Sequence, residues 1–301
     1  MIFCEQERYQ ELKTRLYDIQ AALELLETES DEHLEQELQT NYEFLSSELK
    51  HVEIISLLNQ PFDDKGAFMT VTAGNDNLDS LDWVEMLQRI YANWCKNHDC
   101  KLQLLDESIG EFCGFNYVTL EITGNYAYGY LKSEQGIHQL KRISPFSEDS
   151  QIQTSFAKVE VTPILDETVN FEIPIQDLEF YVQPSNPNSN RISLLVKATH
   201  IPTGISFTSK DKRSQLQNKE QALAVVKSKL FALMQIQGVS LKDVKKASTK
   251  NVANNPIRKY IFHPSCQQVR DLRTNIETSK IEEIMKGNLD LFTKAYLKQT
   301  H

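Results

Sequence analysis

The run FNYVTLEIT, residues 115–123, decides the fold class of this 301-residue chain. In it β-branched and aromatic residues alternate with polar ones, as they do in a strand that buries one face. The same texture returns in four other runs: AFMTVTA (67–73), KLQLLDE (101–107), YAYGYLK (126–132) and SFAKVEVTP (155–163). We therefore predict a β-sheet at the centre of the chain.

One predicted helix interrupts these strands. Its apolar residues fall on a single helical face: Trp83, Met86, Leu87, Ile90, Tyr91 and Trp94. Asp79 or Ser80 is expected to cap its first turn, because a side-chain oxygen there accepts a free backbone N–H. Strands and helix together predict an α+β domain that ends near Val161.

The first sixty residues show helical periodicity in two segments. Apolar positions step by three and four, first at Leu12, Leu16, Ile19, Leu23 and Leu26, then at Leu34, Leu38, Tyr42, Leu45, Leu49 and Val52. We predict an antiparallel helical hairpin that buries the two stripes against each other and leaves its acidic faces in water. A coiled coil with a partner chain is the alternative.

The second half of the chain predicts a smaller α+β unit. Its elements are the strands RISLLVKATH (191–200) and ISFTS (205–209) and the basic helix RSQLQNKEQALAVVKSKLFALM (213–234). Residues 237–259 show little apolar periodicity and are expected to form a mobile basic linker. Residues 270–299 are expected to return to helix.

These elements predict three domains. Residues 1–62 form the helical hairpin, and residues 63–165 together with 256–301 form the central α+β domain. Residues 166–255 form the small α+β domain with its basic helix and linker.

The composition is that of a globular protein in water, with 40% hydrophobic and 25% charged residues. No run approaches the roughly 20 apolar residues of a membrane-spanning helix. The first residues, MIFCEQERYQ, turn acidic at once and lack the order of a signal or transit peptide. A cytoplasmic monomer with no membrane contact is the expectation.

Five cysteines, at positions 4, 95, 100, 113 and 266, are an odd number that predicts reduced thiols. Cys95, His98 and Cys100 form the one cluster that resembles a metal site, but a fourth ligand is missing nearby. The sequence also has no nucleotide-binding loop. We expect neither a metal nor another cofactor.

Charge is unevenly distributed along the chain, whose formal net charge is −10. Residues 1–60 carry fourteen acidic and four basic side chains, a balance of −10, and residues 205–260 carry twelve basic and three acidic ones, a balance of +9. A basic end fits a polyanionic partner, because neutralised phosphates release counterions. A solvated basic helix and tail is the equally good alternative.

Several stretches of this sequence are familiar in their order and spacing. They are DWVEMLQRIYANW, GNYAYGYLKSEQGIHQLKRISPF, THIPTGISF, RSQLQNKEQAL, KSKLFALM, VRDLRTNIET and GNLDLF. Over residues 62 to 298 the chain resembles the bacterial class I peptide chain release factors. The tripeptide Ser144-Pro145-Phe146 is similar to the one that marks peptide chain release factor 2 in that family.

The resemblance implies a protein that occupies the decoding site of a ribosome and contacts mRNA and rRNA there. In the family, the central domain reads UAA or UGA, and a second domain brings a Gly-Gly-Gln loop to the ester between nascent peptide and tRNA. The glycines permit close backbone approach, and a backbone N–H stabilises the oxyanion.

This chain departs from the family at that loop. Gln183 to Asn190 read QPSNPNSN and contain no glycine, and Pro184 and Pro187 each remove a backbone N–H donor. We therefore predict that peptidyl-tRNA hydrolysis is lost and assign no catalytic residue. Gln183 as a displaced catalytic glutamine is the alternative.

The resemblance also implies two sets of RNA-binding residues. The codon-contacting set is Ser144, Pro145, Phe146, Thr154, Gln153 and Gly74. Gln153 stands where the family has a histidine, and an amide stacks on bases less well than a ring. The phosphate-binding set is His138, Lys141, Arg142, Lys210, Lys212, Arg213, Lys219, Lys227 and Lys229.

Three functions remain open at this point. The first is a ribosome-binding, release factor 2-like protein without hydrolysis, acting as a regulator or rescue-type adaptor in translation termination. The second is a working release factor for UAA and UGA. The third is an RNA-binding protein that protects a transcript away from the ribosome.

Overall fold

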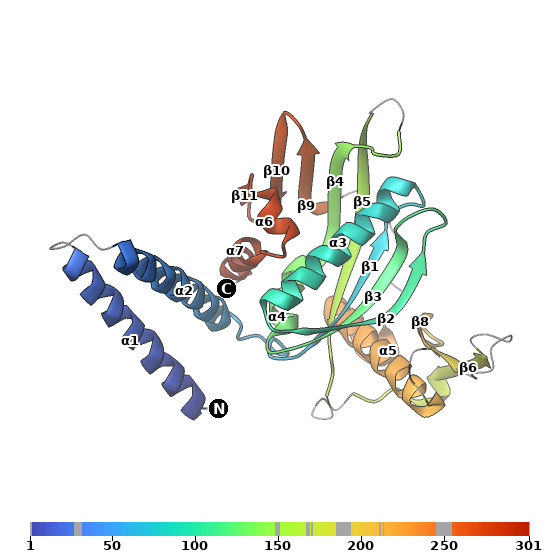
Figure 1. Ribbon diagram of the computed structural model, residues 1–301. Coiled ribbons are helices and arrows are strands. Elements are labelled where there is room, and N and C mark those ends of the chain that lie inside the picture. The colour runs from blue at the N-terminus through green and yellow to red at the C-terminus, as the bar shows by residue number, and fades with distance from the viewer. Residues whose placement is uncertain are drawn as a thin grey trace. The chain divides into compact units, whose positions relative to one another are not determined.

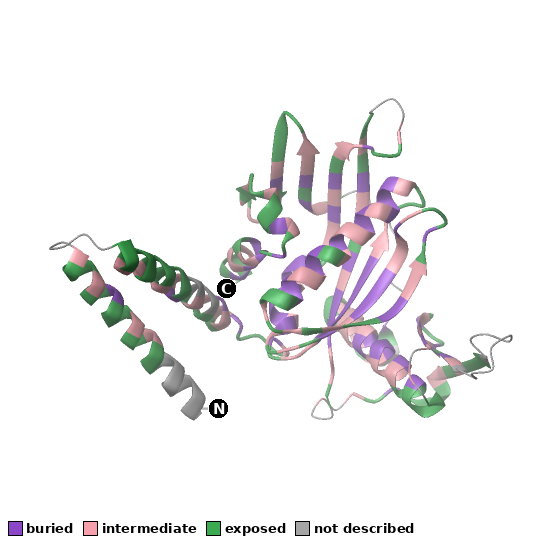
Figure 2. Cartoon of the chain, in the orientation of Figure 1, coloured by how far each residue is buried: buried purple, intermediate pink, exposed green. Residues whose placement is uncertain are grey.

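The computed structural model describes residues 2–26, 32–147, 151–166, 169, 171–184, 194–210, 212, 214–244 and 255–300. Its contacts divide the chain into two units, residues 1–57 and 58–301. The finer division of the second unit into a central and a small domain stays a prediction. Figure 1 shows the elements and Figure 2 the burial of each residue.

The first unit is the predicted helical hairpin, made of α1 (Ile2–Leu26) and α2 (Glu32–Leu57). Ile19 and Leu45 are buried, whereas Leu16, Leu23 and Tyr42 of the same stripes are 44 to 57% exposed. The expected mutual burial of both stripes is therefore only partial.

The second unit contains an eight-stranded sheet with the order β11-β10-β9-β4-β5-β1-β3-β2. Its strands are β1 (Ala67–Ala73), β2 (Lys101–Ile109), β3 (Phe115–Thr123), β4 (Gly136–Ile143), β5 (Ile152–Pro163), β9 (Pro256–His263), β10 (Cys266–Asp271) and β11 (Glu277–Thr278). Neighbouring strands are antiparallel except β4 and β9, which are parallel. Four of the five predicted strands are confirmed, and the α+β fold class is confirmed with them.

The fifth predicted strand, YAYGYLK, is wrong. This segment forms the short helix α4 (Ala127–Leu131) and the 3₁₀ turn η1 (Lys132–Glu134). The backbone N–H groups of Tyr128 and Gly129 donate to carbonyls of Lys65 and Asp63 rather than to a strand. A Cβ at Gly129 would stand 2.8 Å from the Asp63 carbonyl oxygen, so this close approach requires glycine.

Helix α3 (Leu78–Asn97) covers one face of the sheet (Figure 1) and buries Trp83, Leu87, Ile90 and Trp94, as predicted. Its N-cap is Asn77, whose side-chain oxygen accepts from Ser80 N at 2.8 Å. The expected caps Asp79 and Ser80 lie inside the helix, because it begins one residue earlier than Asp79, at Leu78.

A three-stranded sheet, β6-β7-β8, packs with α5 (Gln215–Gln237). Its strands are β6 (Leu178–Pro184), β7 (Leu194–His200) and β8 (Ile205–Ser209), one strand more than predicted. The core of this part also includes Phe68 and Leu105 from the large sheet. A register shift between Leu104 and Asp106 lets Leu105 enter that core as the extra residue of a β-bulge.

Two predictions for the rest of the chain need correction. The segment 237–259, expected to be a linker, overlaps strand β9, which begins at Pro256. At its other end, helix α5 extends to Gln237, and its C-cap Gly238 has a left-handed φ of 64°. Residues 245–254 lie outside the described residues. The C-terminal segment is helical only in α6 (Ile281–Met285) and α7 (Asp290–Thr300), because β10 and β11 precede them.

Two 3₁₀ turns complete the second unit, η2 (Ile175–Asp177) and η3 (Leu241–Asp243). Within the described part of the chain, no helix has the length and apolar character needed to cross a membrane.

The bulge makes a stability prediction with a built-in control. Leu105 is 1% exposed and its neighbour Leu104 is 36% exposed. Leu105→Ala should lower the free energy of unfolding by about 2 to 5 kcal/mol, because it leaves a cavity in the shared core. Leu104→Ala should change it by about 0.5 kcal/mol or less. Urea unfolding measures both, and equal losses would contradict the assigned register.

Candidate RNA-binding site

The predicted codon-contacting tripeptide lies directly after β4, where an ion-pair and hydrogen-bond cluster orders the turn. Ser144 is buried, and its Oγ donates to Asp79 Oδ2 at 2.6 Å and accepts from Phe146 N at 3.2 Å. Arg142 pairs with Asp79 at 3.0 Å and with Asp82 at 2.6 Å. Asp79, at the start of α3, thus ties the turn to the helix.

This arrangement changes the view of two predicted site residues. The only hydrogen of the Ser144 hydroxyl is engaged by Asp79, so the group points into the protein in this conformation. Arg142 was predicted to bind phosphate, yet two carboxylates already neutralise it and its side chain is 13% exposed. Both side chains here order the turn.

Of the predicted codon contacts, Pro145, Phe146 and Thr154 are exposed to solvent. Phe146 is 42% exposed, and the Arg142 guanidinium lies 5.9 Å from the centre of its ring. Gln153 is half-buried and lies opposite Arg142 in the β4–β5 register. These side chains stay predicted RNA contacts.

Gly74 follows β1 and has a structural reason to be glycine. Its N–H donates to the Phe156 carbonyl at 2.8 Å, and an added Cβ would lie 2.7 Å from that same oxygen. Close contact with β5 therefore excludes a side chain here, whether or not RNA approaches.

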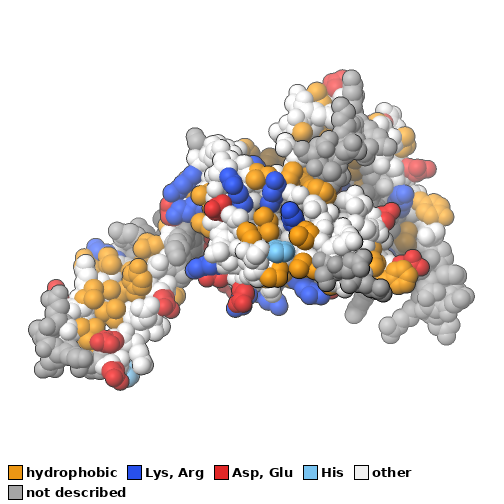
Figure 3. All heavy atoms as spheres, turned by 90° about the horizontal axis from the view of Figure 1, so that it is seen from above, with side chains coloured by type: hydrophobic (Ala, Val, Ile, Leu, Met, Phe, Trp, Pro, Cys, Tyr) orange, Lys and Arg blue, Asp and Glu red, His pale blue; other side chains and the backbone are white. Residues whose placement is uncertain are grey.

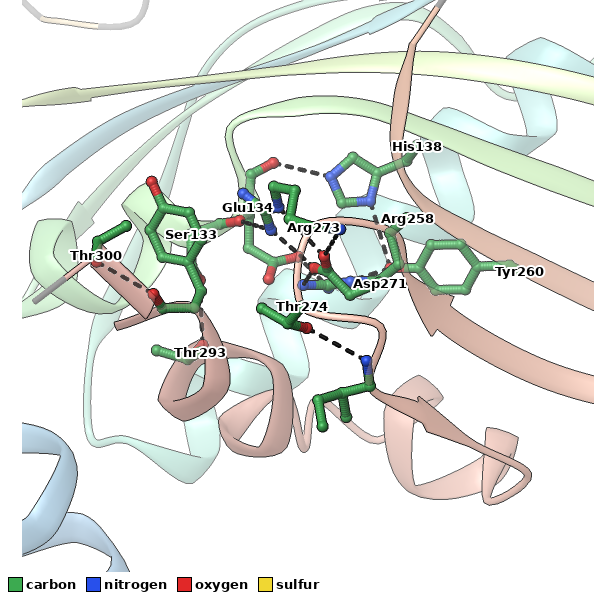
Figure 4. Close-up of polar contacts among 12 residues, drawn as sticks. Ser133, Glu134, His138, Arg258, Tyr260, Asp271, Arg273, Thr274, Thr293 and Thr300 are labelled. Carbon is green, nitrogen blue, oxygen red and sulfur yellow. Dashed lines mark hydrogen bonds and ion pairs between the residues drawn. The ribbon is translucent and has the colours of Figure 1, made fainter. Parts of the chain in front are cut away.

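His138 belongs to a buried polar cluster that Figure 4 shows. It is 0% exposed, and its Nε2 donates to the Glu134 carbonyl at 2.8 Å while Nδ1 accepts from Tyr260 Oη at 3.4 Å. Next to it, Arg258 pairs with Glu134 at 2.7 Å and with Asp271 at 3.3 Å. The prediction that His138 binds phosphate is wrong for this conformation, because both ring nitrogens have protein partners.

Burial lowers the pKa of His138 from 6.5 to about 4, although the Glu134 carboxylate acts in the opposite direction. The ring is therefore neutral at physiological pH. Both ring nitrogens of this β4 residue form hydrogen bonds within the buried core.

The lysines of the predicted phosphate-binding set have different environments. Lys141 is exposed, and Lys227 is half-buried on α5. Lys210 pairs with Asp106 at 3.5 Å, and Lys212 Nζ donates to Gln103 Oε1 at 3.5 Å. Arg213 lies outside the described residues.

Two further lysines contact aromatic rings. Lys219 Nζ lies 4.4 Å from the ring centre of Phe180, and Lys229 Nζ lies 6.0 Å from that of Phe207. Burial lowers the pKa of Lys229, while Glu160 and Asp106 oppose that shift. Lys210, Lys212, Lys219 and Lys229 therefore have intramolecular partners here. Their phosphate contacts stay a prediction.

The degenerate loop is only partly described. Gln183 and Pro184 end strand β6, and residues 185–193 lie outside the described residues. Among the described residues, no group of three His, Cys, Asp or Glu side chains is placed to hold a metal ion.

Sequence reasoning missed two residues that build this site. The sequence predicts Asp79 as a helix cap and places Arg258 among the basic residues at the end of a linker, with no role in the site for either. A single acid before a helix has no signal that reveals its partner on a distant strand. For Arg258, the IRKYIF run around it is rich in β-branched and aromatic residues, a strand signal that could have located β9.

Comparison with known proteins agrees with the fold and the motifs. Residues 4–159 match the PCRF domain and residues 167–273 match the RF-1 domain. The chloroplastic peptide chain release factor PrfB1 of Arabidopsis thaliana is 38% identical over 299 residues, which cover 97% of this chain and 65% of that protein. This chain thus spans less than two thirds of that relative.

Two other relatives agree with this result. Peptide chain release factor 2 of Lactiplantibacillus plantarum is 36% identical over 295 residues, which cover 96% of this chain and 78% of that protein. The structure of RF2 of Thermus thermophilus superposes with a TM-score of 0.73 at 28% identity, covering 98% of this chain and 86% of that one. The chain belongs to the class I peptide chain release factor family. Within it, this chain is close to the release factor 2 homologues.

The buried histidine predicts a pH dependence of stability. The folded-state pKa of about 4 lies below the ordinary 6.5, so the unfolded chain takes up the proton first as the pH falls. Stability from this group is present above pH 6.5 and is lost as the pH falls through 4.

Between pH 7 and pH 4.5 this loss should be about 2 kcal/mol. His138→Gln should be less stable at pH 7 but should show a decline smaller by that amount. Urea unfolding at both pH values measures the difference. Parallel declines in the two proteins would show that His138 is protonated in the folded state.

Proposed function

We propose that this chain binds the ribosome at the decoding site, as a release factor 2-like protein, and does not hydrolyse peptidyl-tRNA. It would then act as a regulator or a rescue-type adaptor in translation termination. The proposal rests on one observation: the segment Gln183 to Asn190 contains no glycine, although it stands where the family has its Gly-Gly-Gln loop.

The chemistry of ester hydrolysis supports the loss of activity. The reaction needs backbone N–H groups held close to the developing oxyanion, and glycine permits the required approach and dihedral angles. Pro184 and Pro187 have no N–H and fixed φ angles. No two glycines are adjacent anywhere in the 301 residues, so no other segment of this chain supplies the motif.

Three observations support binding at the decoding site. The Ser144-Pro145-Phe146 turn is held by Asp79 and Arg142, and an ordered turn loses little conformational entropy on binding. The relatives of comparable sequence are named peptide chain release factors. Phe146 and Thr154 are exposed beside this turn, and exposed side chains there fit contact with unpaired bases.

A release assay tests the catalytic part. Ribosomes with a labelled nascent peptide are stalled on UAA, on UGA and on a sense codon, and peptide release is followed after adding the chain. We expect release at the rate without factor on all three codons. An active release factor 2 serves as the positive control, and release above background on either stop codon would establish a working release factor instead.

Sedimentation with ribosomes tests the binding part separately. We expect the chain to pellet with ribosomes at low salt and to dissociate as salt rises, because phosphate contacts release counterions. A chain that stays in the supernatant even at low salt would contradict ribosome binding and favour an RNA partner away from the ribosome.

A further inference from the structure

Helix α3 covers one face of the eight-stranded sheet (Figure 1). On the opposite face, over β4, β5, β9 and β10, the side chains of Lys141, Thr154, Lys259 and Arg270 are exposed, whereas Gln139 and Phe156 are partly buried. On β4, Arg142 points toward the α3 side, because it pairs with Asp79 of α3. His138 points the same way, because it contacts Tyr260 and the Tyr260 ring packs on Trp83 of α3. Side chains alternate along a strand, so Gln139 and Lys141 point to the other face.

The strand register aligns the side chains of this second face in two rows. Arg270, Lys259, Gln139 and Phe156 are direct cross-strand neighbours across β10, β9, β4 and β5. Gln268, Ile261, Lys141 and Thr154 form the next row along the same four strands. With strands about 4.8 Å apart, each row is about 14 Å long.

We call this surface the open sheet face and define it by six residues: Gln139, Lys141, Thr154, Phe156, Lys259 and Arg270. Lys141 and Lys259 are exposed. Neither forms an ion pair with any residue that the structure describes. Figure 3 shows lysine and arginine side chains gathered on the part of the second unit that includes β9 and β10.

Acidic groups lie only at the borders of this surface, as far as the structure describes it. Glu160 pairs with Lys158 at 2.6 Å, and Glu277 lies 3.9 Å from Arg270. The two central lysines therefore present an uncompensated positive charge. Between them and Gly74 lie the half-buried ring of Phe156 and the hydroxyl of Thr154.

We propose that the open sheet face binds single-stranded RNA, with Lys141 and Lys259 on phosphates and Phe156 against a base. A sheet face that carries an aromatic ring among exposed cations is a common platform for unpaired RNA, since every base offers a face for stacking. Lys259, Arg270 and Phe156 are new to the predicted RNA-binding residues, and Lys141 is shared with them.

The position of this surface explains how it relates to the predicted codon contacts. Thr154 ends one row, and Phe156 at the end of the other contacts Gly74. Lys141 on β4 is three residues before Ser144, and Lys259 lies on the neighbouring strand β9, so both cations are close to the strand end from which the Ser144-Pro145-Phe146 turn begins. The inference goes beyond the proposed function, because it requires RNA binding but not a ribosome.

The test measures fluorescence anisotropy of a labelled single-stranded RNA of about 12 nucleotides, a length within the range of known single-strand sites. The full chain and the double variant Lys141→Ala/Lys259→Ala are titrated over a salt series. Loss of two phosphate contacts should reduce the slope of log K against log salt by about 1.4, at about 0.7 for each contact on a single strand.

A matched control removes the same charge from the other side of the sheet. Lys96→Ala/Lys286→Ala changes two exposed lysines, one in the last turn of α3 and one directly after α6, and should leave the slope unchanged. Phe156→Leu keeps apolar bulk but removes the ring, and it should weaken binding about fivefold or more without changing the slope. Lys141→Gln/Lys259→Gln, which retains the side-chain stems, should repeat the slope change if the alanine variant fails to fold.

Three outcomes would overturn the proposal: no anisotropy change for the wild-type chain at low salt, equal slopes for the open-face variant and the wild type, or equal losses in the open-face and control variants.

Ribosome sedimentation separates this proposal from the previous one. A chain that pellets with ribosomes while its open-face variant binds RNA normally contradicts only the present proposal. A chain that binds RNA through this face but does not pellet contradicts only ribosome binding.

Discussion

The second unit depends on the burial of one charge, the guanidinium of Arg258. Removing a charged group from water costs several kcal/mol unless partners compensate it. Here the partners are the carboxylates of Glu134, just before β4, and of Asp271, at the end of β10. Because both must be in place at once, Arg258 on β9 ties the turn that precedes β4 to the end of β10, next to the parallel pairing of β4 and β9. Both the tripeptide turn and the open sheet face are built on that pairing.

Much of this fold follows from the sequence, where a segment's own residues decide its structure. The strands β1, β3 and β5 and the helix α3 show the periodicity of half-buried elements, and they were predicted correctly. YAYGYLK has the same texture, but its backbone donors are taken by carbonyls at Lys65 and Asp63. The pattern of one segment contains no information about such distant partners.

The candidate site was less predictable, because its residues were selected by type and their partners were unknown. Histidine and arginine near a basic region suggest phosphate binding. The side chain of His138 on β4 is buried, however, and the charge of Arg142 is neutralised by Asp79 and Asp82. Lys259 falls in the predicted linker and Arg270 in the segment that is predicted to be helical. Only the cross-strand register places Lys259 on the strand next to Lys141 and Arg270 on the strand beyond it.

The parallel pairing of β4 and β9 also has a consequence during synthesis. Glu134 and Arg258 are separated by 124 positions in the chain. At about 5 to 20 residues per second, a ribosome needs on the order of ten seconds to make that length. Throughout this interval β4 has an unpaired edge and Glu134 lacks its cation, so the nascent chain exposes a sheet edge that chaperones bind and that favours aggregation.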